Sequence, residues 1–250
     1  MISDLDLITV NWSAPAHIHA CSTTRHGGVS CGDYQGLNLG AHVQDDPIIV
    51  EKNRLLLSQK LSLSPSLCWL NQTHSTTLLH IKTDTQSGVE ADASWTDLHN
   101  QPCVVMTADC LPVLVTDKTG IFVCAIHAGW RGLCDGIIES SITNICNKLK
   151  IQSDQLLVWL GPCIGKEAFV VGEEVRAEFI AQNSQASRAF TVYQDRYLAD
   201  LHALARLRLA PFNVAEITEN NQSTFSEPEH FYSYRRDGKT GRMATLIWIE

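Results

Sequence analysis

The sequence predicts a mixed α/β (α+β) fold of one domain, in which mixed β-sheets are flanked by helices. The chain has 250 residues, 44% of them hydrophobic and 18% charged, which is typical of a globular protein with a sizeable core. Strand-like and helix-like segments follow one another without the strict alternation of a regular Rossmann sheet. No repeat, low-complexity tract or Pro/Gly/Ser linker divides the chain, so residues 1–250 are expected to form a single domain.

The first half of the chain is expected to contain several strands and one helix. Residues 8–22 alternate loosely between apolar and polar side chains, which indicates strands. A helix is expected over residues 47–60, because Asp46 can cap it and Pro47 suits its first turn. Further strands are expected at residues 68–70, 103–107 and 113–116.

The second half is expected to open with the most apolar strand of the chain. Residues 121–126 are all apolar, which is typical of a central strand buried on both faces. The segments that follow predict a helix over 133–149, a strand over 156–160, helices over 172–181 and 199–209, and a C-terminal β-hairpin formed by 231–235 and 243–249.

Charge and cysteine content exclude several classes of partner. Lys and Arg number 19 and Asp and Glu 27, which gives a net charge of −8 without any basic run. Such a chain is a poor binder of nucleic acid or of a membrane surface. The N-terminus lacks the features of a secretory signal, and the nine cysteines contain no C-x-x-C pair. We therefore expect a cytoplasmic protein with reduced thiols.

Three side chains suggest chemistry, because they lie at the ends of expected strands, where α/β proteins place ligand sites. They are His74, Cys110 and His127. Two imidazoles and a thiolate form a normal zinc set with one open position, although each residue alone is more often structural. A second interpretation makes Cys110 a nucleophile and His127 its base, with Asp109 or another carboxylate orienting the histidine. Chelation separates the two, since only a zinc enzyme would lose activity.

Anion binding is expected near the glycine turn at 129–132, which precedes a helix, although the glycines could equally serve a tight turn. The turn is not a P-loop. Other candidates are Arg25, Arg54, Arg235 and Arg236. Since 231–235 is expected to be a strand, Arg235 and Arg236 should point to opposite faces, and at most one should reach a given site.

Seven short blocks of sequence occur in order and, taken together, are more specific than any one residue. They are Thr24–Ser30 (TRHGGVS), Gly36–Gly40 (GLNLG), Asn53-Arg54, Asn71–His74 (NQTH), Ala108–Val113 (ADCLPV), His127–Gly132 (HAGWRG) and Phe231–Asp237 (FYSYRRD). Over nearly the whole chain this pattern resembles the YfiH-type, laccase-domain family, historically labelled multicopper polyphenol oxidoreductases. One departure is visible, because Ser223-Thr224 stands where the family usually has Cys-Thr, which puts in doubt a thiol role at that position.

The resemblance implies a YfiH-like single domain and a zinc-dependent purine nucleoside phosphorylase. It implies that His74, Cys110 and His127 hold one catalytic Zn2+. The implied substrates are inorganic phosphate with adenosine, inosine or S-methyl-5'-thioadenosine, and adenosine deamination is an implied side activity. Oligomeric state stays open between a monomer and a small homo-oligomer.

Further residue roles follow from this expected reaction. Arg25, Arg54 and Arg235 are expected to hold phosphate as bidentate partners. Asn38 and Gln72 are candidates for hydrogen bonds to the ribose or the base. Asp109 would either orient a metal ligand or act as general acid/base, and we favour the orienting role.

Two alternatives to the phosphorylase remain. The first is a copper-dependent, laccase-like polyphenol oxidase, because Cu2+ can replace zinc at such ligands. Against it, a multicopper enzyme needs many histidine ligands, and His17 and His19 form the only H-x-H pair. The second alternative is a non-catalytic nucleoside-binding protein, which would bind nucleosides tightly without turnover.

Overall fold

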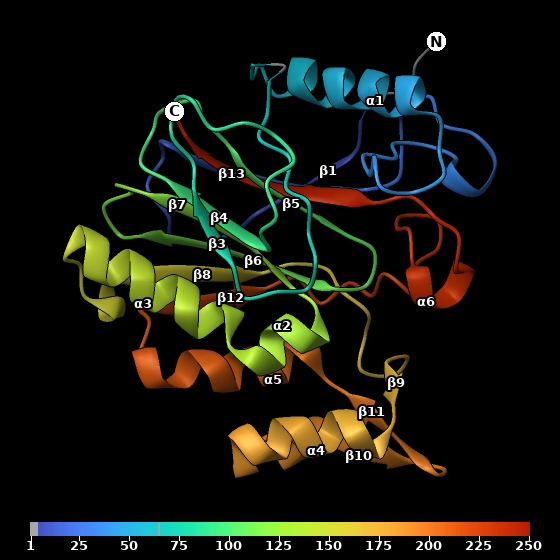
Figure 1. Cartoon of the computed structure of the whole chain (residues 1–250), viewed down its shortest axis with the longest axis vertical. Coiled ribbons are helices and arrows are strands. Elements are labelled where there is room, and N and C mark those ends of the chain that lie inside the picture. Colours follow the sequence, from blue (N-terminus) through green and yellow to red (C-terminus); the bar gives the residue numbers. More distant parts are fainter. Residues whose placement is uncertain (1–4, 65) are drawn as a thin grey trace.

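Two stacked β-sheets form the centre of the molecule in the computed structural model, which describes residues 5–64 and 66–250 (Figure 1). The larger sheet has six strands in the order β12-β8-β6-β7-β4-β3. Their bounds are β3 Leu78–His80, β4 Ala93–Thr96, β6 Leu111–Asp117, β7 Val123–Ala128, β8 Leu156–Leu160 and β12 Glu216–Glu219. Strand β7 is flanked by β6 and β4, so it is an interior strand as predicted, but it begins at Val123, and Ile121 at the start of the predicted run is exposed.

The second sheet has four antiparallel strands in the order β1-β2-β13-β5. They are β1 Leu7–Thr9, β2 Ile18–Thr23, β13 Met243–Ile249 and β5 Cys103–Thr107. The predicted C-terminal hairpin is wrong. Residues Tyr234–Asp237 form the short helix α6, and β13 pairs with β2 and β5, both distant in sequence. All seven residues of β13 are buried, because both faces of this sheet pack in hydrophobic clusters.

Helix α1 (Pro47–Lys60) covers the outer face of the four-stranded sheet (Figure 1). Asp46 caps it, since its carboxylate accepts a hydrogen bond of 2.8 Å from the amide of Ile48. Leu57 of α1 packs in one cluster with Leu246 of β13. The neighbouring residue of β13, Ile247, belongs instead to the cluster between the two sheets. This alternation fixes the register, because a shift by one residue would exchange the two faces.

Four more helices lie on the side of the six-stranded sheet that faces away from the four-stranded sheet (Figure 1). They are α2 Trp130–Asp135, α3 Ile137–Leu149, α4 Glu173–Gln182 and α5 Leu201–Leu209. A small sheet of β9 (Val170–Val171), β11 (Arg196–Ala199) and β10 (Phe190–Tyr193) lies beside α4. Short 3-10 turns occur at Gly32–Tyr34, Ser153–Gln155, Ser184–Ala189 and Ala210–Phe212.

Most of the predicted elements exist, and the α+β class is confirmed. Two corrections concern local backbone. The single helix expected over 133–149 is broken at Gly136, whose φ of +92° ends α2 before α3 begins. Residues 68–70 are no strand, because the amide of Trp69 binds the hydroxyl of Ser87 and its carbonyl binds the amide of Gly88. No helix of the described residues has the length and apolar character needed to cross a bilayer.

Candidate metal and substrate site

Three donor side chains from separate segments meet at one point. His74 lies in the loop before β3, Cys110 between β5 and β6, and His127 in β7. Their ligand atoms all lie within 4.8 Å of one another, and Cys110 Sγ is 3.8 Å from His74 Nε2. The imidazole rings of His74 and His127 meet edge to face, with centroids 4.9 Å apart. The cluster runs from an exposed His74 through a partly buried Cys110 to a buried His127.

A buried carboxylate, Asp92, holds two of these three donors in place. Its Oδ1 accepts hydrogen bonds from the ring Nδ1 of His127 at 2.8 Å and from the amide of His74 at 2.9 Å. Its Oδ2 accepts from the amide and the hydroxyl of Ser75 at 2.7 and 2.8 Å. Since Nδ1 of His127 donates to Asp92, Nε2 is the ring nitrogen that is left for the cluster. A carboxylate behind a ligating histidine is the usual arrangement at metal sites.

At two positions of the site the backbone has a positive φ angle, which residues other than glycine normally avoid. His74 has a φ of +62° and Asp109 a φ of +95°. Neither residue is glycine, so both positions are strained and depend on surrounding hydrogen bonds. The bonds of Asp92 to residues 73–75 hold the first turn, and the main-chain bond from Ile164 N to Asp109 O helps to hold the second.

The charges of the cluster favour an ionised sulfur. Burial alone would raise the pKa of the Cys110 thiol, but the charge and hydrogen bonds of His127 and His74 lower it below its usual value. Burial would lower the pKa of His127, but Cys110 and Asp92 raise it above its usual value. For Asp92, burial acts to raise the pKa, and hydrogen bonds from His127 and Ser75 hold it well below the usual range. A thiolate is the form that binds metals and also the form that attacks electrophiles, so both sequence-based interpretations remain chemically possible.

Gly129 leaves the room that the cluster needs. A Cβ atom added at this position would lie 2.5 Å from Cδ2 of His74 and 3.3 Å from Sγ of Cys110. Gly129 is also the residue before α2, which has only six residues. The glycines of this turn therefore have a steric role, which was one of the two interpretations left open by the sequence.

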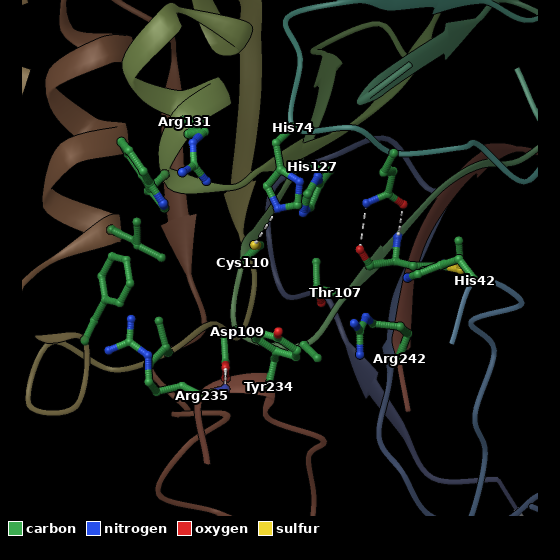
Figure 2. A pocket seen from close by; sticks show the side chains of 17 residues that line it. His42, His74, Thr107, Asp109, Cys110, His127, Arg131, Tyr234, Arg235 and Arg242 are labelled. Carbon is green, nitrogen blue, oxygen red and sulfur yellow. Dashed lines mark hydrogen bonds between the residues drawn. The ribbon is translucent and has the colours of Figure 1, made fainter. Parts of the chain in front are cut away.

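The cluster forms part of the wall of a cavity of about 540 Å3, which Figure 2 shows from close by. Seventeen residues line it: His42, Gln72, His74, Met106, Thr107, Ala108, Asp109, Cys110, His127, Trp130, Arg131, Ile164, Phe169, Leu201, Tyr234, Arg235 and Arg242. Such a volume is within the range of small-molecule sites. Three arginines also line the cavity. In Figure 2, Arg131 and Arg235 lie on one side of the cluster and Arg242 lies on the other.

These three arginines differ in how firmly they are held. Arg235 donates to the carbonyl of Val170 at 2.8 Å, and its own amide binds Asp109. Arg242 is held by its neighbouring carbonyls, and burial lowers its pKa. Arg131 lies over the ring of Trp130, and no hydrogen bond or ion pair within residues 5–64 and 66–250 engages its guanidinium. Arg131 therefore has the most free donors for a ligand.

Three residues that we predicted to contact substrate lie outside the lining of this cavity. Arg25 donates to the carbonyls of Pro228 and Gln35. Arg54 donates twice to the carbonyl of Leu39 and lies over the ring of Trp69. Asn38 is fully buried, and its Oδ1 accepts from the amide of Arg242 at 2.9 Å. Asn38 thus contacts the cavity only through the backbone of a lining residue.

Gln72 lines the cavity, but both ends of its amide bind the backbone of Met106, at 2.8 Å each. Asp109 also lines it, yet its carboxylate binds the hydroxyl of Thr224 and the amide of Arg235. Asp92, and not Asp109, is the carboxylate bonded to a histidine of the cluster. Ser223 accepts from the amide of Gly165 and does not line the cavity.

Arg235 and Arg236 do point different ways, although they lie in helix α6 and not in a strand. Arg235 lines the cavity, whereas Arg236 binds the carbonyls of Thr224, Phe225 and Phe231. Sequence reasoning missed Asp92, His42 and Arg242 and did not single out Arg131 within its glycine turn. Asp92 stands between two alanines, a context without any motif.

The fold and the site define an α+β protein with a His/Cys/His donor set in the wall of a basic cavity. A family model described as multi-copper polyphenol oxidoreductase laccase matches residues 19–250. The chain therefore belongs to this laccase-domain family, which includes the YfiH proteins.

Similar proteins cover nearly the whole chain. A Pseudomonas aeruginosa protein named purine nucleoside phosphorylase is 46% identical over 245 residues, or 97% of this chain and 98% of that protein. Escherichia coli YfiH, also named purine nucleoside phosphorylase, is 45% identical over 243 residues, with 97% and 98% covered. The crystal structure of a Neisseria meningitidis protein matches with a TM-score of 0.91 at 43% identity, covering 98% of this chain and 99% of that one.

Proposed function

We propose that this protein is a purine nucleoside phosphorylase, which cleaves adenosine, inosine or S-methyl-5'-thioadenosine with inorganic phosphate. The observation that carries the proposal is the meeting of His74, Cys110 and His127 in the wall of a cavity that also presents three arginines. The names of relatives that share nearly the full length of the chain support the same reaction.

The cavity suits both substrates. A volume of about 540 Å3 is within the range that encloses a small organic ligand such as a nucleoside. Aromatic rings of Trp130, Phe169 and Tyr234 line it and offer stacking surfaces for a base. Arginine binds phosphate through paired N–H groups, and we assign this role to Arg131, Arg235 and Arg242. We leave Arg25 and Arg54 out of this assignment, because neither residue lines the cavity.

We propose Zn2+ as the metal that the cluster holds. Two imidazoles and one thiolate match the ligand preference of zinc and leave a position open. The orientation of His127 by Asp92 and the ionised state favoured for Cys110 fit this use. Zinc held there would supply Lewis-acid chemistry toward the substrate, and it would activate water for the adenosine deamination that we include as a side activity.

The protein's own residues have distinct tasks in this scheme. Arginines place phosphate against the sugar carbon, which turns a bimolecular attack into a reaction between held partners. Their positive charge also holds the phosphate anion, which is the nucleophile, beside the sugar carbon that it attacks. Asp92 fixes the ring of His127 and the turn of His74, so the cluster does not have to reorganise during turnover.

Free cysteines at all nine positions support a reducing, cytoplasmic compartment.

The test is a turnover assay on the zinc-loaded protein. With inosine and phosphate we expect hypoxanthine and ribose-1-phosphate in equal amounts, and no hypoxanthine when phosphate is left out. Arg131→Gln should raise the KM for phosphate about 10-fold or more, since a charged hydrogen bond is worth about 1.5–3 kcal/mol. The matched control is Arg188→Gln, an exposed arginine outside the cavity, which should behave as the unchanged protein.

Three results would contradict the proposal. Absence of phosphate-dependent base release from all three nucleosides would exclude the phosphorylase. Full activity after complete removal of metal would favour Cys110 as a nucleophile instead. Phenol oxidation that requires several copper atoms per chain in protein purified without added copper would favour the laccase-like alternative.

A further inference from the structure

A second group of metal-type donors lies outside the cavity. It consists of Asp6, His26 and His230, which come from the segment before β1, the glycine turn after β2 and the loop before α6. One ligand atom from each residue lies within 4.8 Å of the others. None of the three lines the cavity described above.

Main-chain hydrogen bonds hold the three segments together. The amide of Thr24 donates to the carbonyl of Asp6 at 3.2 Å, and the amide of Arg25 donates to the carbonyl of His230 at 2.8 Å. The hydroxyl of Thr24 accepts from the amide of His26 at 3.2 Å. Residues 24–26 therefore connect all three donors, so their approach follows from the fold and not from chance contact of long side chains.

The two imidazoles are free to bind a ligand. Their rings meet edge to face with centroids 5.3 Å apart. In the described part of the chain, no hydrogen bond or ion pair engages a ring nitrogen of His26 or His230. Most other histidines have such partners, for example His127 with Asp92 and His19 with Glu250. The carboxylate of Asp6 has one weak contact, at 3.5 Å, from the hydroxyl of Thr24.

We propose that Asp6, His26 and His230 form a second metal site, which binds a divalent transition metal ion. Two imidazoles and a carboxylate are ligands that suit Zn2+ and bind Cu2+ still more tightly. Oxygen-seeking ions such as Mg2+ and Ca2+ would bind poorly, because only one of the three donors is an oxygen. All three residues are exposed, so water completes the coordination and chelators reach the ion easily.

The site also joins the N-terminal segment to the loop at 225–233. A metal ion bound by donors from both would add a cross-link between segments that are more than 200 residues apart in the chain. Since the ion binds the folded chain and not the separated segments, its binding stabilises the fold. The proposal does not depend on the phosphorylase reaction, because these residues lie outside the cavity.

The test is metal stoichiometry after dialysis against buffered micromolar Zn2+, measured by mass spectrometry of the metal. The unchanged protein should hold two zinc ions per chain, and His26→Ala or His230→Ala should hold one. Cys110→Ala should also lose one, and the double variant His230→Ala with Cys110→Ala should hold none. The control His19→Ala, a half-buried histidine of β2, should keep two.

Cu2+ gives a second readout when the first site is already filled with zinc. One added equivalent should give an electron paramagnetic resonance signal with two nitrogen ligands, reduced to one nitrogen in His230→Ala. Asp6→Asn, which preserves side-chain shape, should weaken copper binding about 10-fold while circular dichroism stays unchanged. A single zinc equivalent in the unchanged protein, or a second equivalent that survives in both histidine variants, would overturn the proposal.

Discussion

At the scale of single residues, Asp92 determines the geometry of the site. One buried carboxylate accepts hydrogen bonds from the ring of His127 and from three consecutive amides at residues 73–75. It therefore orients one donor directly and the other through its backbone turn. Its low pKa means that it carries a full negative charge throughout the neutral range, which favours a positively charged or metal-bound His127.

Asp92→Asn should weaken zinc binding about 10- to 100-fold and lower kcat, while the fold is kept. Asparagine retains the shape but removes the charge and cannot accept all of the bonds. Zinc affinity measured by chelator competition, together with kcat and KM, checks this expectation. The control is Asp117→Asn, a buried aspartate at the other end of β6 that binds the turn at Thr119 and Ile121. Equal loss of zinc in both variants would argue for a general structural effect.

Gly129→Ala should abolish zinc binding, because the new methyl group would occupy the space of His74 and Cys110. The comparison is Gly161→Ala, where an added Cβ meets Pro112 and Trp159 at 2.7 Å, so crowding is similar but no donor is touched. We expect both variants to lose stability and only Gly129→Ala to lose zinc. If Gly129→Ala bound zinc normally, the steric role assigned to this glycine would be wrong.

At the scale of elements, the break between α2 and α3 sets the shape of the cavity wall. The sequence predicts a single helix over 133–149, but Gly136 divides this segment. In the structure its left-handed backbone redirects the chain. The short α2 then presents Trp130 and Arg131 to the cavity, while α3 packs Ile138 and Ile142 against the sheet.

Gly136→Ala should lower the free energy of unfolding by about 1–2 kcal/mol, since alanine is strained in the left-handed region. The position has room for a methyl group, so the effect is one of backbone conformation alone. Urea denaturation measures it. Asn144→Ala, on the exposed face of α3, serves as control and should stay within about 0.5 kcal/mol of the unchanged protein. No difference between the two variants would contradict this account of the break.

The elements that the sequence predicted well are those fixed by local pattern. Strands 103–107 and 156–160 and the helix 47–60 have the predicted bounds, because apolar runs and a helix cap are local signals. Where prediction failed, distant partners decide the structure. The expected hairpin at the C-terminus required 243–249 to pair with its neighbour, but β13 finds better burial between β2 and β5.

At the scale of the whole molecule, the layers share their sheets and should unfold together. The four-stranded sheet contributes one face to the cluster under α1 and the other to the cluster between the sheets. The six-stranded sheet likewise contributes to the cluster between the sheets and to the one under α3 and α5. No layer can lose its packing without exposing an apolar face of the next.

Leu246→Ala in β13 should cost about 2–5 kcal/mol, because the side chain is fully buried in the cluster under α1. Tryptophan fluorescence and far-ultraviolet circular dichroism should shift to the same lower midpoint, as in a single cooperative transition. Val192→Ala, at a position 73% exposed, should change little. Two separate transitions in Leu246→Ala would show that the layers unfold independently.

The site was predicted only in part, for a physical reason. His74, Cys110 and His127 stand out because polar residues at strand ends have few packing roles. Arg25 and Asn38 also lie in the seven sequence blocks that carry the family resemblance. In the structure, however, these two side chains bind main-chain groups and do not line the cavity. The sequence shows which residues are unusual, whereas only the packed fold shows which of them face the same space.

The cavity draws its lining from positions 42 to 242, so almost every layer of the fold contributes to it. No fragment of the chain carries a usable half of the active centre, and recombining separate pieces would have to restore every long-range pairing first. Turnover can therefore serve as a stringent measure of complete folding. A partly folded chain should show no turnover, even where its helices have already formed.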